Sequence, residues 1–133
     1  MMATSSTGVD RGSITAFVVC LAMTFIVTAG LAVDSGRLVE ARIAAADHAE
    51  NAARVAVQQV GGIRTGERTV DPVRARRAAG QYLAQFALTG DIRIEPKSVT
   101  VTVRLTKDMT LLRLVGVSRR QVSAERRAEL IDR

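Results

Sequence analysis

Residue types that commonly carry chemistry are scarce in this sequence. It has one cysteine, Cys20, and one histidine, His48. A lone cysteine excludes an intrachain disulfide, and with one histidine it cannot provide the spacing of a zinc site. No glycine-rich phosphate loop and no serine within a nucleophile motif is present. We therefore expect a protein that is not an enzyme and that has no metal, no cofactor and no catalytic residues.

Proline and aromatic residues are also rare. The first proline is Pro72, and tryptophan is absent. Without proline, nothing in the first half of the chain interrupts a long helix. With four aromatic residues in all, the core of any folded part must be built from Val, Ile, Leu and Ala.

Lysine is nearly absent, whereas 17 arginines bring the formal net charge to +6. A basic balance can indicate nucleic-acid binding, but these arginines are spread along the chain and no aromatic platform accompanies them. We expect no nucleic-acid partner. Weak contact with anionic lipids or anionic cell-envelope polymers, or simply a solvated surface, fits the composition better.

Residues 13–33 form an uncharged, apolar stretch of 21 residues. A helix needs about 20 such residues to cross a bilayer, so this stretch predicts a transmembrane segment that follows a short polar leader at residues 1–12. A cleaved signal peptide is the alternative, with small residues at 27–29 and 30–32 as cleavage sites. The apolar stretch is longer than the 7–15 residues typical of signal peptides, which favours a retained anchor.

The charges that flank this segment do not settle its orientation. Arg37 and Arg42 after the segment outnumber Arg11 before it, and taken alone this favours a cytoplasmic C-terminal domain. Long domains cross the membrane largely regardless of such charges, so both orientations stay open on this ground.

Small residues recur at every fourth position through the apolar segment. They are Ala16, Cys20, Thr24, Thr28, Ala32 and Gly36. We call them the small-residue row. Such a row forms a groove on a helix, and close approach through small residues drives helix association in membranes. We expect these residues to be a helix-packing surface.

Residues 34–60 continue the same helix as an amphipathic extension. Its apolar stripe is made mainly of alanines, so a packing partner can come close, and we expect the stripe to serve in helix association together with the small-residue row. The stripe comprises Leu38, Ala41, Ala45, Ala49, Ala52, Ala56 and Val60. His48 lies beside the stripe and is expected to be a surface residue. Gly61 and Gly62 are expected to end the helix.

Residues 61–133 are expected to form a small α+β head domain. Asp71 and Pro72 predict the start of a second helix that runs to about residue 87, with an apolar face of Ala79, Tyr82, Leu83 and Phe86. Period-two alternation predicts a hairpin at residues 92–105, with a turn at Pro96 and Lys97.

The end of the chain suggests two further elements. Residues 109–115 suggest a helical turn, and residues 121–128 a third strand at a sheet edge, with Val122 and Ala124 facing inwards. Arg74, Arg76 and Arg77 suggest either a contact patch or a solvated face.

The stretch from Arg11 to Ala56 resembles the TadE/TadG-like pilus-assembly proteins of bacterial tight-adherence (Flp) pilus systems, most closely the actinobacterial type. The resemblance rests on the Arg11-Gly12-Ser13 leader, on GLAVDSGRLVEAR after the apolar run with its Asp34-x-Gly36-Arg37 element, and more loosely on VTVTVRL and LLRLVGV. It implies a pilin-like α+β fold, possible processing at Gly12, and other pilus-machine membrane proteins as partners. It also implies a cytoplasmic leader and a C-terminal domain outside the cell.

The resemblance departs from the family at one informative position. Members often carry a glutamate five residues after the leader glycine, where filament subunits are processed and registered; here that residue is Phe17. We therefore expect a non-enzymatic, single-pass component of a Flp pilus or related secretion system, a minor pseudopilin or assembly accessory, that acts by helix–helix association and stays in the membrane. The alternatives are a secreted soluble binding module after signal-peptide cleavage and a membrane enzyme or regulator with a cytoplasmic domain.

Overall fold

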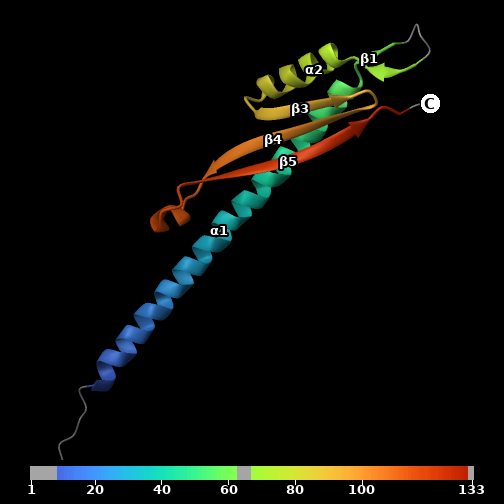
Figure 1. Ribbon diagram of the computed structural model, residues 1–133. Helices are drawn as coiled ribbons and strands as arrows, with labels where there is room; N and C mark the ends of the chain where they lie inside the picture. Colours follow the sequence, from blue (N-terminus) through green and yellow to red (C-terminus); the bar gives the residue numbers. More distant parts are fainter. Residues whose placement is uncertain (1–8, 63–66, 132–133) are drawn as a thin grey trace, which may run out of the picture.

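The computed structural model describes residues 9–62 and 67–131 and has an α+β fold (Figure 1). This confirms the predicted fold class. In chain order, the elements are the helix α1 (Val9–Val57), the strands β1 (Val60–Gly61) and β2 (Thr69–Val70), the helix α2 (Pro72–Gln85), the strands β3 (Thr89–Glu95) and β4 (Ser98–Asp108), the 3₁₀ turn η2 (Leu112–Val115) and the strand β5 (Arg119–Glu129).

Helix α1 is continuous over 49 residues and passes from the apolar segment into the amphipathic extension without a break. Its end differs from the prediction, which placed it at Val60. The helix stops at Val57, and Val60 pairs instead with Val70 in the short β1–β2 ladder. The amide of Asp71 donates to the carbonyl of Gln59 at 2.7 Å, which holds the chain after α1 against the start of α2.

The three-stranded antiparallel sheet has the order β3–β4–β5. Its register pairs Ile92 with Val101 and Glu95 with Ser98, which confirms the hairpin and its turn at Pro96 and Lys97. Strand β5 lies at an edge, as predicted from its charges. The pairing of Ala124 with Val103 places that alanine on the apolar face of β4, also as predicted.

The core lies between this sheet, the extension of α1 and α2. Val99, Val101 and Val103 of β4 are completely buried. Their neighbours on α1 are buried alanines, namely Ala45, Ala49, Ala52, Ala53 and Ala56. Because alanine side chains are short, the sheet packs close to the helix backbone. The space between them is therefore small and is filled without large aromatic side chains.

Helix α2 starts at a side-chain cap and buries one face. Oδ1 of Asp71 accepts the amides of Val73 and Arg74, each at 3.0 Å. Ala75, Ala79 and Leu83 are buried against α1 and β3. The helix ends at Gln85, slightly before the predicted residue 87, so Phe86 of the predicted apolar face follows the helix end and is 46% exposed.

His48 is not the plain surface residue that was predicted. Its ring is half-buried between α1 and α2 and lies in an aromatic cluster, with ring centroids 4.9 Å from Phe86 and 6.1 Å from Tyr82. Its Nδ1 is 3.2 Å from the Tyr82 hydroxyl. Helix α2 covers this part of α1, which the stripe pattern of a single helix does not reveal.

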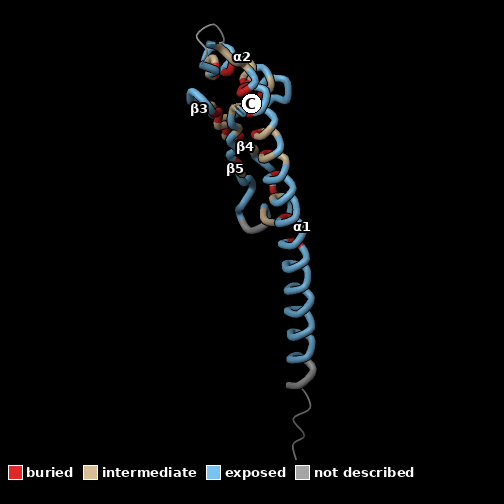
Figure 2. Tube along the Cα trace, turned by 90° about the vertical axis from the view of Figure 1, so that its right-hand side faces the viewer, coloured by how far each residue is buried: buried red, intermediate tan, exposed pale blue. Residues whose placement is uncertain are grey.

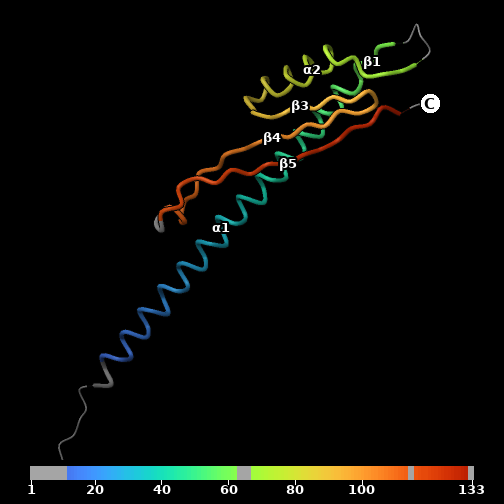
Figure 3. Tube along the Cα trace, viewed as in Figure 1, coloured from blue at the N-terminus to red at the C-terminus, as the bar shows by residue number. Residues whose placement is uncertain are grey.

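Residues 109–118 connect β4 to β5, and we call this segment the hook. It contains the predicted helical turn, η2, which ends at Gly116 with a left-handed φ of 91°. The hook lies against the middle of α1, whereas α2 lies against its C-terminal end (Figures 1 and 3). From Gly12 to Ala29, every residue of α1 is exposed, and the first buried residue is Gly30 at the level of the hook (Figure 2).

Candidate functional site

The small-residue row lies on the part of α1 that no other element of the described chain covers. All six of its residues are exposed. A Cβ atom added at Gly36 would meet no atom within 4 Å. The row is therefore accessible to another helix, which the predicted packing role requires. Gly12, the possible processing position, lies near the start of α1 and has equally open surroundings.

The polar atoms in the row are satisfied within the helix. The Thr24 hydroxyl donates to the carbonyl of Cys20 at 2.8 Å, and the Thr28 hydroxyl donates to the carbonyl of Thr24 at 2.7 Å. An unpaired hydroxyl would be costly in an apolar medium, so these bonds fit both threonines for contact with lipid or with another apolar helix. Cys20 has a free thiol at the same surface.

The row turns around α1 as it rises. Four residues advance an α-helix by about 400°, so each step shifts the row by about 40° and the five steps from Ala16 to Gly36 by about 200°. Gly36 also follows Asp34 by two residues, or about 200° around the axis. Since Asp34 contacts the hook, Gly36 faces the opposite side of α1, where the protein's own head does not block a partner.

The alanine stripe does not have the role that was predicted for it as a second association surface. Ala41, Ala45 and Ala49 are at most 1% exposed. The sheet of the same chain covers this part of α1 (Figure 2). The partner that packs closely on the stripe is the head itself, so of the two predicted association surfaces the small-residue row is the one that stays exposed.

Asp34 joins α1 to the hook. Its carboxylate is completely buried and accepts three backbone amides: Thr110 at 3.2 Å, Leu111 at 2.9 Å and Leu112 at 2.8 Å. These amides open the turn η2, whose own capping residue, Leu111, has no side chain able to accept them. Asp34 therefore caps a turn that lies more than seventy residues further along the chain.

The same three amides set the charge state of Asp34. The bond from the Leu112 amide, with those from Thr110 and Leu111 and the nearby Arg37 guanidinium, holds the pKa of the Asp34 carboxyl below its ordinary value, although burial acts in the opposite direction. Arg37 also donates to the Thr110 hydroxyl. Asp34 is thus ionised at neutral pH, and the three-residue spacing between Asp34 and Arg37 brings both side chains to one loop.

Gly30 supplies the close approach beside this cap. A Cβ atom at Gly30 would lie 2.9 Å from Cδ1 and 3.1 Å from Cβ of Leu111, so only glycine leaves room for the leucine. Of the family element that was singled out in the sequence, Asp34 and Arg37 contact the hook and Gly36 does not. The glycine that contacts the hook is Gly30.

Sequence reasoning missed the structural role of Asp34 and Gly30. One signal was available: a carboxylate follows directly on an apolar segment, where a charge is costly unless it is paired. A second was the sequence TLLRL, a helical turn with no acidic residue in it to accept its first amides. Neither signal identifies the partner, because the two segments meet only in the folded chain.

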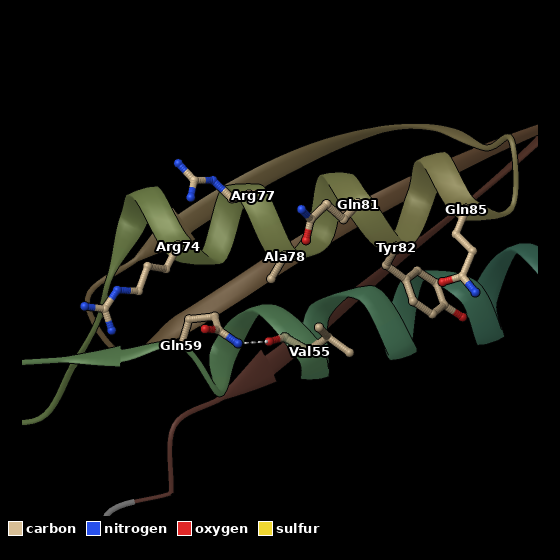
Figure 4. Close-up of a pocket in the computed structure, with 8 residues that line it drawn as sticks. All are labelled: Val55, Gln59, Arg74, Arg77, Ala78, Gln81, Tyr82 and Gln85. Carbon is tan, nitrogen blue, oxygen red and sulfur yellow. Dashed lines mark hydrogen bonds between the residues drawn. The ribbon is translucent and has the colours of Figure 1, made fainter.

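The three arginines of α2 do not form a single patch. Arg74 and Arg77 line a groove of about 600 Å³ between α1 and α2, together with Gln59 and Tyr82 (Figure 4). Arg76 borders a different hollow, over the outer face of the sheet. Arg74 is already ion-paired with Asp71 at 3.3 Å, and all three are exposed, which supports the solvated face over the contact patch.

Among the residues that the structure describes, no three His, Cys, Asp or Glu side chains come together as metal ligands would. Helix α1 is the one element of the described chain that is long and apolar enough to cross a membrane, with a mean hydropathy of 2.5 in its most apolar part. Comparison of the chain with family models, with curated proteins and with solved structures gave no match.

Proposed function

We propose that the chain is a non-enzymatic, single-pass membrane protein whose α1 helix spans the bilayer and presents the α+β head on one side of it. The observation that supports this most strongly is that α1 changes from exposed to covered at the level of the hook. From Gly12 to Ala29 the helix is uncharged and every residue is exposed, whereas beyond Gly30 the helix is progressively covered by its own head. An exposed apolar surface of this length is not stable in water, and its length of about 27 Å over 18 residues fits the bilayer core.

The proposed role is that of a minor pseudopilin-like or accessory component of a tight-adherence pilus or related secretion machine. Support comes from the resemblance around Asp34-x-Gly36-Arg37 and from the architecture, in which a head packs on the upper half of one long helix (Figure 1). Association with other membrane helices of the machine would use the small-residue row, which is accessible along its length. Following the resemblance, the head lies outside the cell and the N-terminus inside.

The contacts of the hook argue against the secreted alternative. Cleavage at 27–29 or 30–32 would cut α1 beside Gly30, which packs on Leu111, and would leave Asp34 in a frayed new terminus. A retained helix keeps the cap intact. The cap therefore gives a second reason to favour an anchor over a signal peptide, in addition to the length of the apolar segment.

The test is fractionation of cells that express the full chain with a C-terminal tag. We expect the intact chain in the membrane pellet after alkaline carbonate washing, which removes peripheral proteins. A shortened chain in the medium would overturn the anchor. As a matched control, replacement of Met23 and Phe25 by arginine should move the chain out of the membrane fraction, because two charges at the centre of a span are costly.

A further inference from the structure

The hook meets α1 at one end of the apolar segment. Leu111 packs on Gly30, and Asp34 accepts the hook's amides just beyond Val33. Residues 13–33 extend about 31 Å as a helix, close to the roughly 30 Å of a bilayer's hydrocarbon core. If α1 spans the bilayer, as proposed above, the hook lies at the membrane surface on the side of the head.

The side chains of the hook are suited to that position. Although Leu111 packs on Gly30 with one side, it stays 37% exposed, and Val117 is 36% exposed. In a soluble loop these would be ordinary exposed residues. At the level of the headgroups, they can enter the boundary between the headgroups and the acyl chains, as the apolar faces of interfacial helices do.

Basic residues surround this apolar tip. Lys107 and Arg120 are paired across the β4–β5 ladder at its base, and Arg113 lies within η2. All three are exposed, and none has an acidic partner within the described residues. The one acidic residue nearby on the hairpin, Asp108, is paired with Arg119 at 3.2 Å. Unpaired cations around an apolar tip match the anionic headgroups of a bacterial membrane.

The backbone of the hook is also prepared for a poorly hydrated environment. Asp34 accepts the amides of residues 110–112, the Met109 amide donates to the Ser118 carbonyl at 2.9 Å, and the Val117 amide donates to the Leu112 carbonyl at 3.0 Å. Backbone amides without partners are costly away from water. The buried carboxylate therefore does more than fasten the loop to α1, because it satisfies the amides that would otherwise need water.

From these observations, we propose that the hook is a second membrane contact. It lies in the interface of the bilayer that α1 spans, inserts Leu111 and Val117 at the headgroup–acyl boundary, and binds anionic phospholipid headgroups through Lys107, Arg113 and Arg120. Two contacts fix the rotation of α1 and the direction in which the head faces. The proposal rests on the spanning role of α1, so its test must separate the two.

The absence of tryptophan from the chain permits single-tryptophan reporters in the full-length protein in nanodiscs. Phe17→Trp reports on the span, Val117→Trp on the hook, and Val73→Trp, at a 67% exposed site on α2, on the remote head. In phosphatidylglycerol bilayers we expect a nitroxide on the lipid acyl chain to quench Phe17→Trp. A nitroxide near the headgroup should quench Val117→Trp, whose emission should also be blue-shifted relative to that of the protein in detergent-free buffer without lipid contact at that site. Val73→Trp should show neither effect.

Quenching of Phe17→Trp while Val117→Trp behaves like Val73→Trp would overturn the hook proposal and leave the span intact. An unquenched Phe17→Trp would contradict the span and, with it, the hook contact. If tryptophan at 117 disturbs the hook, an environment-sensitive dye at the exposed Ser118, introduced as Ser118→Cys in a Cys20→Ser background, reports on the same segment.

A separate experiment tests the binding of anionic headgroups. Arg113→Gln and Arg120→Gln, added singly to Val117→Trp, should each lower the ratio of membrane-bound to free hook by about fivefold in anionic bilayers, with a much smaller effect in phosphatidylcholine. Arg93→Gln, at an exposed arginine on the outer face of the sheet, is the matched control and should have no effect. Equal ratios in both lipids for all variants would overturn the claim that anionic headgroups bind here.

Discussion

The carboxylate of Asp34 accepts the backbone amide of Leu112 at 2.8 Å, across 78 positions of sequence. This bond and its two neighbours mark the boundary between two environments on one helix. On one side of it α1 is bare and apolar, and on the other side α1 is the central element of a folded head. The account of the protein depends on this boundary.

Asp34→Ala should release the hook and leave the rest of the head folded. Within the described residues, Asp34 is the acceptor for the amides of residues 110–112, and no other acceptor would replace it. The core around Val99 and Val101 lies at the opposite end of β4 from the hook. Hydrogen exchange should therefore become faster at residues 110–112 and stay unchanged in β4. Asp47→Ala, at an exposed aspartate of the same helix, is the control. Faster exchange throughout the head would contradict a local role.

Acid should release the hook in the same way. The folded pKa of Asp34 is lower than its ordinary value of about 3.9, so its contribution to stability is complete above that value and is lost as the pH falls through the lower, folded pKa. We expect exchange at residues 110–112 to be independent of Asp34 titration from pH 8 to 5, after correction for intrinsic rates, and to rise below about pH 4. Asp34→Asn should abolish the titration. A release midpoint near pH 6 would contradict this assignment.

Gly36→Leu and Gly30→Leu should produce opposite phenotypes. At Gly36 a side chain meets open space, so the head should stay intact while association through the small-residue row weakens. At Gly30 a side chain overlaps Leu111, so hook exchange should accelerate. A bacterial membrane two-hybrid assay measures association, and Ala32→Leu should behave like Gly36→Leu. Unchanged association in both row variants would contradict the packing role of the row.

Gly90→Ala should destabilise the head, because a Cβ there would overlap the backbone carbonyl oxygen of Thr102 in the neighbouring strand. Rigid backbone cannot give way cheaply, and we expect a loss of about 1–3 kcal/mol in the free energy of unfolding. Gly80→Ala is the matched control, since its Cβ meets nothing in α2 and alanine favours helix by up to about 1 kcal/mol. Denaturant unfolding in detergent measures both, and equal midpoints would contradict the tight β3–β4 contact.

Local patterns predicted most of the fold. The three- and four-residue spacing along residues 34–57 identified the alanine stripe, and strict alternation in residues 99–105 identified β4. The end of α1 was placed three residues late, because Val60 continues the stripe and only its ladder with Val70 removes it from the helix. Periodicity describes one element at a time, so it could not show that α2 covers His48.

The boundary at Asp34 could not be predicted in this way. The carboxylate and the hook amides are joined by a contact that exists only after β4 and β5 have turned the chain back along α1. Nothing in the spacing of either segment identifies the other. The sequence marked Asp34 and Arg37 through a family resemblance, and the structure supplies a physical reason for both residues.

The most direct test of the account asks on which side of the membrane each end of the chain lies. In a Cys20→Ser background, Gln58→Cys reports on the exposed position directly after the end of α1, and Ser5→Cys on the leader. With a membrane-impermeant maleimide on intact cells, the account predicts labelling of Gln58→Cys, and labelling of Ser5→Cys only after permeabilisation. Labelling of both, or of Ser5→Cys alone, in intact cells would contradict a single span with an exported head.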